Sequence, residues 1–393
     1  MSSTMRLALF TDTYAPEING VAKTLERWVG YLRRNGIACQ VFAPARPKGE
    51  AIVSEEAERL ASFRFFLYPE LRVAVPVSFA AERELLRFRP TAVHVATPFG
   101  TGLTGRRLAL KHGIPLVASH HTHFVRYLPF YNLQWMGKLL WSYLHWFHRP
   151  CRRIYVPSRS VQEECGRDGW RGLEVWSRAV DTGLFHPFVE RERFLSEAGV
   201  PASRFVLLYA GRLAPEKRTG LAVEALRRFV RDSGADAELV FAGDGPTAGA
   251  LHALADKHGV RARFLGAVPQ PELQRWMAAS DALLFPSPTE TFGNVVLEAM
   301  ACGLPVIGAD AGAVPDTVRD GATGLLCRED DADAFAAAIA RLHADDGLRS
   351  RLSAAALADA RSRSWDDVFG RLLASIRESS DDAGPSGRED AVV

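Results

Sequence analysis

The sequence predicts an α/β protein of two doubly wound domains, each with a parallel sheet covered by helices on both faces. Two observations support this prediction. Short apolar runs alternate with helical patterns along the chain, and the series stops in the irregular stretch DTGLFHPFVERERF and then starts again. Apolar strands that alternate with helices are typical of parallel sheets that are buried on both faces. We therefore place the domain boundary near residue 183.

The expected strands are short and apolar, as buried parallel strands are. An amphipathic helix is expected near 22–35, after the first of them. In the first series the strands lie at 6–12, 38–44, 92–98, 115–121 and 152–158. In the second series they lie at 204–211, 237–245, 262–268, 282–287, 305–310 and 323–327. We assign residues 1–183 to the first domain and 184–363 to the second, and the small polar residues 379–393 predict a disordered tail.

Composition and charge argue against several classes of protein. The 393 residues are 47% hydrophobic and 24% charged, which is ordinary for a globular chain with a large core. The 48 basic and 46 acidic residues give a net charge of +2, so nothing draws the whole chain to nucleic acid. The five cysteines form no C-x-x-C pair, which suits free thiols in a reducing compartment. No run approaches the roughly 18 apolar residues of a membrane span, and the start lacks a signal-peptide pattern, so we expect a cytoplasmic protein.

In open α/β sheets, ligands bind outside the carboxyl ends of the strands, so polar residues at those ends are candidates for a site. Arg212 ends the strand of RFVLLYAGR, and Lys217 follows in the loop before the next helix. Two cations beside a helix N-terminus suit an anion such as a diphosphate. The alternative is that both are solvated surface charges.

Two glutamates mark a second candidate region, SPTETFGNVVLEAMACGLPVIGAD. Glu290 lies in the loop after a strand, and a helix is expected from about Gly293 to Cys302. Asn294 and Glu298 are four residues apart and therefore share one face of that helix. A buried carboxylate needs hydrogen-bond donors, and a sugar nucleotide offers hydroxyls at both ends. We expect one glutamate to bind the transferred sugar and the other the ribose; the alternative is a solvated Glu298 and an ordinary loop charge at Glu290.

The segments GRLAPEK, PSPTETFGNVVLEAMACGLPVI and DGATGLL together resemble family 4 of the retaining glycosyltransferases. The motif of that family is a glutamate, seven residues and a second glutamate, with an arginine and a lysine upstream. The resemblance runs from TDTYAPEINGVAKTLERWVGYLRRNG to about residue 375. It implies the GT-B fold, in which two Rossmann-like domains enclose the active site in the cleft between them. It also implies that a C-terminal helix, at about 364–378, crosses back onto the first domain.

The resemblance also implies roles for single residues. Glu290 would bind the donor sugar and Glu298 the ribose. The leaving diphosphate would be neutralised by Arg212 and Lys217. Contacts near the sugar and phosphate would come from Phe292, Gly293, Asn294 and Val295.

Two segments of the first domain match the family as well. PEINGVAKT matches a glycine loop that is often Gly-Gly in the family; here Asn19 takes the first position and leaves Gly20 alone to allow close approach of a phosphate. Asparagine tolerates the left-handed conformation better than most residues, so the loop shape can survive. HHTHF matches a family His-Thr, with His121 as the catalytic-site residue and His120 and His123 as structural ones.

The stretches HTHFVRYLPFYNLQWMGKLLWSYLHWFHRP and VWSRAVDTGLFHP resemble bacterial enzymes that mannosylate glycolipids from GDP-mannose. They also resemble sulfoquinovosyl- and glucosyl-diacylglycerol synthases, which use UDP donors. We therefore expect a retaining enzyme that moves a hexose from a nucleotide-diphosphate sugar to a hydroxyl of a lipid or glycolipid, and we favour GDP-mannose. A UDP-sugar donor and a soluble small-molecule acceptor are the alternatives. No cofactor and no metal are expected.

Residues 126–153 combine aromatic and basic side chains without an acid. They hold three of the eight tryptophans, Trp135, Trp141 and Trp146, and five cations, Arg126, Lys138, Arg149, Arg152 and Arg153. This mixture suits the headgroup layer of an anionic membrane, so we expect peripheral contact with the inner face of a membrane. The alternative is a core helix that packs its rings inward.

Other motifs have simpler explanations. GTGLTG (Gly100, Gly102 and Gly105) matches the dinucleotide fingerprint, but it does not follow the first strand of its unit and lacks the acid downstream. Asp331 and Asp333 precede an alanine-rich helix, so capping is favoured over metal binding. A phosphorylase of this shape would hold pyridoxal phosphate in a much longer chain. An epimerase would lack the paired glutamate motif, and a binding module would not need Arg212, Lys217 and both glutamates together.

Overall fold

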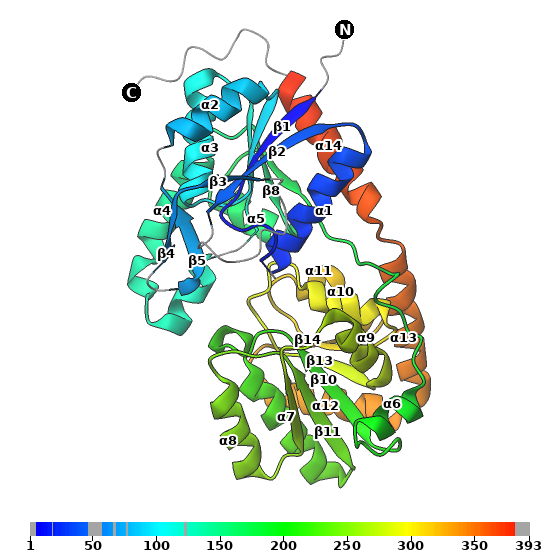
Figure 1. Cartoon of the computed structure of the whole chain (residues 1–393). Helices are drawn as coiled ribbons and strands as arrows, with labels where there is room; N and C mark the ends of the chain where they lie inside the picture. Colours follow the sequence, from blue (N-terminus) through cyan, green and yellow to red (C-terminus); the bar gives the residue numbers. More distant parts are fainter. Residues whose placement is uncertain are drawn as a thin grey trace.

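The computed structural model describes residues 5–17, 19–45, 57–65, 68–75, 78–121 and 124–381. It confirms the predicted fold class, because two parallel sheets flanked by helices form two bodies, one above the other in Figure 1. Every strand pair in both large sheets is parallel. In sheets of this kind ligands bind at the carboxyl ends of the strands, so a site is expected at those ends.

The first domain is built on seven strands in the order β3-β2-β1-β6-β7-β8-β9. These are β1 (Arg6–Phe10), β2 (Ala38–Pro44), β3 (Ala57–Leu60), β6 (Ala92–Val95), β7 (Leu116–Ser119), β8 (Arg153–Val156) and β9 (Leu173–Val175). An antiparallel pair, β4 (Ser62–Phe65) and β5 (Tyr68–Ala74), stands beside it. The helices are α1 (Gly20–Arg34), α2 (Phe79–Phe88), α3 (Gly100–His112), α4 (Gly137–His148) and α5 (Arg159–Arg167), with 3-10 helices η1 (Phe124–Tyr131) and η2 (Gln134–Met136) before α4.

The second domain is built on six strands in the order β12-β11-β10-β13-β14-β15. These are β10 (Phe205–Ala210), β11 (Ala237–Ala242), β12 (Ala262–Gly266), β13 (Ala282–Phe285), β14 (Val306–Ala309) and β15 (Gly324–Cys327). Its helices are α6 (Arg191–Glu197), α7 (Thr219–Ser233), α8 (Ala248–His258), α9 (Gln270–Ala279), α10 (Asn294–Ala301), α11 (Val314–Thr317), α12 (Ala332–Ala344) and α13 (Asp346–Arg361), with the 3-10 helix η3 (Pro215–Lys217) before α7.

In each sheet, successive strands are added on one side of the first strand and then on its other side. The change falls between β1 and β6 in the first sheet and between β10 and β13 in the second. At such a switch point the connections leave on opposite faces, which opens a crevice at the carboxyl ends. In the second sheet the strands on either side of this point are apolar throughout: β10 is fully buried along FVLLYA, and β13 along ALLF. The sequence therefore puts its polar residues directly after these strands, at the crevice.

The last helix, α14 (Trp365–Asp381), belongs to the first domain although it follows the second in the chain. It runs beside α1 in Figure 1, and Phe369 packs against Trp28 and Trp176 with ring centroids 5.4 and 6.5 Å apart. The hydroxyl oxygens of Tyr155 and Ser375 lie 2.9 Å apart across this contact. The crossing helix that the resemblance implied is thus present; it continues to Asp381, three residues into the stretch expected to be the tail.

The GTGLTG motif is a packing device. A Cβ atom at Gly100 would lie 1.9 Å from the carbonyl oxygen of Ala74, and one at Gly105 would lie 2.5 Å from the Phe10 ring. Only glycine lets α3 come this close to its neighbours. Gly100 and Gly105 are thus required by packing within the first domain.

Candidate functional site

Lys217 and Glu290 meet at the switch point of the second sheet. Lys217 ends η3, after β10, and Glu290 lies in the loop after β13, the strand that pairs with β10. The Lys217 Nζ is 2.6 Å from Glu290 Oε1, and the Ser287 hydroxyl donates to the same oxygen at 3.0 Å. Both side chains of the pair are about 15% exposed (16% and 15%). The sequence predicted both residues for one site, but assigned them to different parts of the ligand and did not foresee their pairing.

The Glu290 loop is held in place by its backbone. The Glu290 carbonyl accepts a hydrogen bond from Ala313 N at 2.9 Å. Gly312 has a φ of +59°, and a Cβ there would lie 2.8 Å from the same carbonyl oxygen. The Thr289 hydroxyl donates to the Glu216 carbonyl at 3.2 Å, which joins this loop to the turn that carries Lys217. A carboxylate on such a support is pre-organised for a ligand.

The predicted helix after Glu290 is confirmed as α10. Gly293 has a φ of +79°, a left-handed conformation that suits glycine, and the helix begins at Asn294. Its N-cap residue, Gly293, has no side chain that could accept a hydrogen bond from the first amides of the helix. Val295 is half-buried, and the ring of Phe292 packs in the core of the second domain. Any ligand contact of Phe292 therefore comes from its backbone.

Glu298 is half-buried on α10 and lies close to the first domain. Burial raises the pKa of its carboxyl to about 7, and the nearby cations Lys23 and Arg27 of α1 oppose that rise. Arg27 is itself held by Asp181, with Nη2 3.2 Å from Oδ2. The interpretation of Glu298 as a freely solvated surface charge is therefore wrong. Arg212 lies in the turn after β10, where its carbonyl accepts the Tyr209 hydroxyl at 3.0 Å.

The glycine loop of the first domain faces α10. Gly20 opens α1, and a Cβ there would lie 3.0 Å from Asn294 Nδ2. Asn19 caps α1: its Oδ1 accepts from Ala22 N at 2.9 Å, and its Nδ2 donates to the Thr13 hydroxyl at 2.7 Å. The backbone of Asn19 is extended, with φ −137°. The left-handed conformation that we considered for Asn19 is therefore not adopted, because this residue caps the helix instead.

His121 lies two residues after the end of β7, and its side chain is buried. Its carbonyl accepts from the hydroxyl of Thr291 at 2.9 Å, so it touches the loop of Glu290 in the other domain. Its Nδ1 is 2.8 Å from Arg178 Nη2. Burial, and then the charge of Arg178, hold the pKa of His121 well below its usual value, so its ring is neutral at physiological pH.

The other two histidines of the HHTHF segment are His120 and His123. His120 is buried, with its ring 5.2 Å from that of Trp170 and 5.4 Å from that of His148. This position in an aromatic cluster agrees with a structural role. His123 lies outside the described residues.

Arg178 and Asp316 are parts of this region that sequence reasoning missed. Arg178 is 4% exposed, although arginine is among the residues least often buried. Asp316 of α11 accepts a hydrogen bond from the backbone N of Ser160, in the first turn of α5, at 2.9 Å. Both contacts join residues far apart in the chain, and neither residue belongs to a local pattern that could have signalled it.

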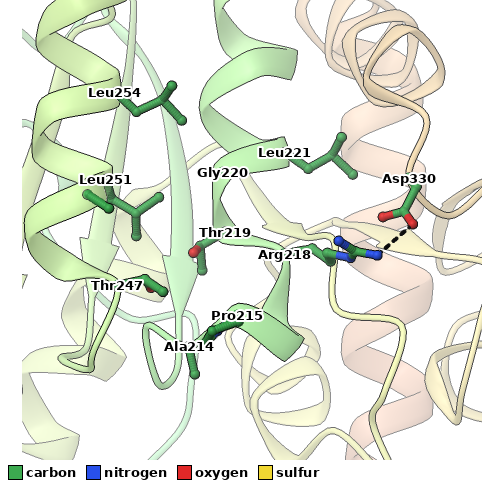
Figure 2. Close-up of a pocket in the computed structure, with 11 residues that line it drawn as sticks. Ala214, Pro215, Arg218, Thr219, Gly220, Leu221, Thr247, Leu251, Leu254 and Asp330 are labelled. Atoms are coloured by element: carbon green, nitrogen blue, oxygen red, sulfur yellow. Dashed lines mark hydrogen bonds and ion pairs between the residues drawn. The ribbon is translucent and has the colours of Figure 1, made fainter. Parts of the chain in front are cut away.

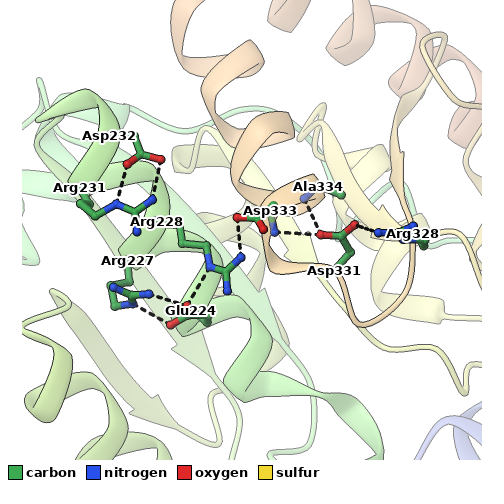
Figure 3. Close-up of polar contacts among 9 residues, drawn as sticks. All are labelled: Glu224, Arg227, Arg228, Arg231, Asp232, Arg328, Asp331, Asp333 and Ala334. Carbon is green, nitrogen blue, oxygen red and sulfur yellow. Dashed lines mark hydrogen bonds and ion pairs between the residues drawn. The ribbon is translucent and has the colours of Figure 1, made fainter.

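Asp331 caps α12, as predicted. Its Oδ1 accepts from the backbone N of Asp333 at 3.1 Å and of Ala334 at 3.0 Å (Figure 3). Asp333 is 2.5 Å from Arg228, which also contacts Glu224. In the part of the chain that the structure describes, no group of three or more histidine, cysteine, aspartate or glutamate side chains could hold a metal ion.

A pocket of about 400 Å³ lies between the N-terminal part of α7 and α8 (Figure 2). Leu221, Leu251 and Leu254 line it, and an ion pair of Arg218 with Asp330 at 2.9 Å stands at its edge. Neither Lys217 nor Glu290 lines this pocket. Its lining residues Ala214, Pro215 and Arg218 flank Lys217 in the chain, so the pocket adjoins the turn that carries this lysine.

The aromatic stretch at 126–153 turns one side to the core and the other to solvent. Leu144 and Phe147 of α4 are buried, whereas Trp135 is 74% and Leu139 69% exposed. Three of the five cations have partners: Arg126 pairs with Glu164, Arg153 with Glu174, and Arg152 donates to the Ser379 carbonyl. The other two, Lys138 and Arg149, are exposed. Among the described helices, none combines the length and apolar character needed to cross a bilayer.

Comparisons with known proteins add to this geometry. Residues 18–184 match the family described as Glycosyltransferase Family 4, and residues 190–359 match Glycosyl transferases group 1. A relative from Mycobacterium tuberculosis, named GDP-mannose-dependent alpha-mannosyltransferase, is 32% identical over 383 residues, which cover 94% of this chain and 95% of the relative. The chain belongs to glycosyltransferase family 4.

Other matches agree with the family 4 assignment. The sulfoquinovosyl transferase SQD2 of Arabidopsis thaliana is 28% identical over 373 residues, covering 93% of this chain and 72% of that protein. A sucrose-phosphate synthase from Thermosynechococcus elongatus has the same GT-B fold, with a TM-score of 0.80 at 20% identity over 95% of this chain and 98% of that one. The family 4 protein is thus a hexosyltransferase with the GT-B fold, as the sequence resemblance implied.

Proposed function

We propose that this family 4 enzyme transfers mannose from GDP-mannose, with retention of configuration, to a hydroxyl of a lipid or glycolipid acceptor. The observation that carries the proposal is the Lys217–Glu290 pair at the switch point of the second sheet, with the N-terminus of α10 beside it. Cations and helix amides stabilise a diphosphate as it leaves. Arg212 and Lys217 take that role, together with the α10 amides of Asn294 and Val295 and the close approach that Gly20 allows.

The two glutamates then divide the donor between them. Glu290 accepts hydroxyls of the hexose and Glu298 accepts hydroxyls of the ribose. The ion pair with Lys217 places Glu290 at the point where the sugar and the phosphate meet. The leaving phosphate oxygen takes the proton of the acceptor hydroxyl, and the cations hold the separating charges together. The anomeric configuration of the first product, read by NMR, tests this route, and a β-linkage from an α-donor contradicts it.

The choice of donor rests on the relatives. Those named GDP-mannose-dependent are 30–32% identical across almost their whole length, while the sulfoquinovosyl transferase is 28% identical and is covered to 72%. A thermal-shift panel of GDP, UDP, GDP-mannose and UDP-glucose tests this choice, because a ligand that binds only the folded state raises its melting temperature. We expect GDP and GDP-mannose to stabilise the protein. A larger shift with the UDP ligands would replace this donor by a UDP-sugar.

The lipid acceptor is supported by the exposed side of η2 and α4. Trp135, Leu139 and Trp146 are exposed there, next to Lys138 and Arg149. Apolar rings beside cations favour the interface of an anionic bilayer, and each cation near such a surface contributes about 1 kcal/mol. Peripheral binding through this side would bring the cleft to a lipid hydroxyl.

Flotation with anionic and neutral liposomes, at low and high salt, tests membrane binding. We expect binding to anionic vesicles that weakens with salt, and weakens further in a Trp135→Ala/Leu139→Ala variant. Phe188→Ala removes an equally exposed ring, 73% accessible, outside this stretch and serves as the control. Absence of flotation together with efficient transfer to a water-soluble acceptor would assign this enzyme the soluble-acceptor alternative.

A further inference from the structure

Arg178 is a buried cation whose contacts are unusual. Its Nη1 donates to the carbonyls of Trp176 at 2.9 Å and Ser177 at 3.3 Å, and its guanidinium lies 4.9 Å from the Trp176 ring centroid. Its remaining partner is the His121 Nδ1, at 2.8 Å. Within the described residues, no carboxylate forms an ion pair with it. A buried charge without a counter-ion is costly, so its position beside the site points to a function.

The chemistry of the two groups fixes the state of His121. A guanidinium has five N–H donors and no acceptor, and it stays protonated in proteins. The Nδ1 of His121 must therefore accept the hydrogen bond, which leaves its proton on Nε2. In the part of the chain that the structure describes, the Nε2 of His121 is buried and has no hydrogen-bond partner. A buried N–H without a partner is unfavourable until a ligand oxygen accepts from it.

The position of His121 links this donor to the Lys217–Glu290 pair. Its carbonyl is bound by Thr291, the residue directly after Glu290. Its ring is packed 5.1 Å from that of Trp176, so the ring cannot turn freely. The same tryptophan supplies a carbonyl to Arg178 and a surface to the ring. Thr291, Trp176 and Arg178 therefore hold His121 in place together, and its Nε2–H is the donor that remains.

We propose that Arg178 is a positioning residue that keeps His121 as the neutral tautomer with its proton on Nε2, so that His121 donates a hydrogen bond to an oxygen of the transferred hexose. The inference rests on the proposed function, since it assumes that the donor sugar lies beside Glu290. In this arrangement His121 is a fixed donor and does not exchange protons during transfer. Arg178 touches no substrate and acts only through His121.

Other titratable groups around His121, besides Arg178, also lower its pKa. The titratable groups that face it are Arg178 after β9, His94 on β6 and His120 after β7, and all three lower its pKa. His94 is itself held neutral, with its pKa lowered to about 3 by burial, and its Nε2 lies 2.6 Å from the Ser119 hydroxyl. Arg178 is therefore the permanent charge in this set, and its removal should raise the pKa of His121 most.

The test compares Arg178→Met and Arg178→Lys with the natural enzyme. Protein labelled with ¹⁵N in its histidine rings is followed by NMR from pH 5 to 8, and His121→Asn identifies the His121 signals. In the natural enzyme we expect His121 to show an unprotonated Nδ1 and a protonated Nε2 throughout. In Arg178→Met we expect a mixture of tautomers that titrates, and Arg178→Lys should keep part of the original state because its ammonium can still donate to Nδ1.

Turnover and nucleotide binding complete the test. We expect kcat of Arg178→Met to fall roughly 10- to 100-fold, as when the partner of a functional histidine is removed at metal sites. The affinity for free nucleotide should not change, and Arg178→Lys should recover part of the lost kcat. A His121 that titrates in the natural enzyme would overturn the proposal, as would a changed tautomer with unchanged kcat. The NMR result needs no donor, so it stands apart from the test of which donor the enzyme uses.

Discussion

The two domains build their parts of the cleft in different ways. In the second domain, Lys217, Glu290 and Glu298 follow two adjacent strands and lie in two short segments of sequence. In the first domain, Gly20, His121 and Arg178 come from three separate segments and depend on contacts across the fold. The difference shows that candidate residues at adjacent strand ends can be read from local spacing, whereas a residue that acts through a distant partner, as Arg178 does through His121, cannot. It also predicts that changes in the second domain affect the donor nucleotide most directly.

The largest effect expected from this comparison is that of Lys217→Ala. If its cation stabilises the charge that develops on the leaving phosphate, as proposed, its loss should lower kcat by about 10²- to 10³-fold, as the loss of one such donor does in other enzymes. Lys257→Ala, at an exposed lysine of α8, is the matched control and should leave kcat unchanged. Steady-state kinetics with a nucleotide-sugar donor measures both. A Lys217→Ala enzyme within threefold of the natural one would show that the diphosphate lies elsewhere.

The next effect separates the two glutamates. Glu298→Ala should weaken donor and free nucleotide alike, by roughly 10- to 150-fold, because a hydrogen bond to a charged group contributes about 1.5–3 kcal/mol. Glu290→Ala should lower turnover strongly but leave free-nucleotide affinity unchanged or tighter, since it frees Lys217 from its ion pair. Titration calorimetry with GDP and UDP gives the affinities. Equal losses in both variants would mean that the two roles are wrongly assigned.

A smaller effect should appear with pH. The pKa of Glu298 is raised to about 7. If its ionised form accepts the ribose hydroxyls, as proposed, nucleotide affinity should increase as pH rises from 6 to 8. The unliganded protein should respond in the opposite sense: the folded state binds more protons than the unfolded state between the usual pKa of 4.5 and 7, so this group's contribution to stability is lost as pH rises through that window.

Glu298→Gln provides the comparison for the pH dependence. The phosphates of the nucleotide titrate equally for both proteins, so the difference between their affinity profiles isolates Glu298. Parallel profiles for the two proteins would show that Glu298 does not bind the nucleotide, or that its pKa lies in the ordinary range.

The smallest effect is expected from chelation. If the cations and the α10 amides stabilise the leaving diphosphate, transfer should continue in excess EDTA at an unchanged rate. A rate assay with and without EDTA, followed by added magnesium or manganese, measures this. Loss of activity that either metal restores would assign part of the diphosphate's stabilisation to a metal ion.

Much of the fold could be predicted from sequence because the central strands are continuous apolar runs. Within the two large sheets, the strands that the sequence did not predict are at edges: β3 carries AERL and β9 carries LEV, and each is partly exposed. The separate antiparallel pair of β4 and β5 was not predicted either. Edge strands need only one buried face and are often short and polar, so their pattern is too weak to recognise. The loop and helix of Glu290 were predictable because Gly293 and Gly303 mark both ends of the helix.

The parts of the site that could not be predicted depend on distance in the chain. Nothing in VWSRAV indicates that Arg178 is buried against a histidine 57 residues earlier. The pairing of Lys217 with Glu290 likewise follows from the adjacency of β10 and β13, which spacing alone does not give. Asn19 was mistaken for a left-handed loop residue because its capping bond depends on where α1 begins.

The return of α14 to the first domain has a consequence for biosynthesis. The apolar side of α1 and Trp176 are buried partly by Phe369, Leu372 and Ile376, which the ribosome adds only after it has completed the entire second domain. Domains usually fold in order of synthesis, but here the first one stays uncovered while some 180 further residues emerge. During translation this surface is open to chaperones, and premature termination anywhere in the second domain leaves both domains defective.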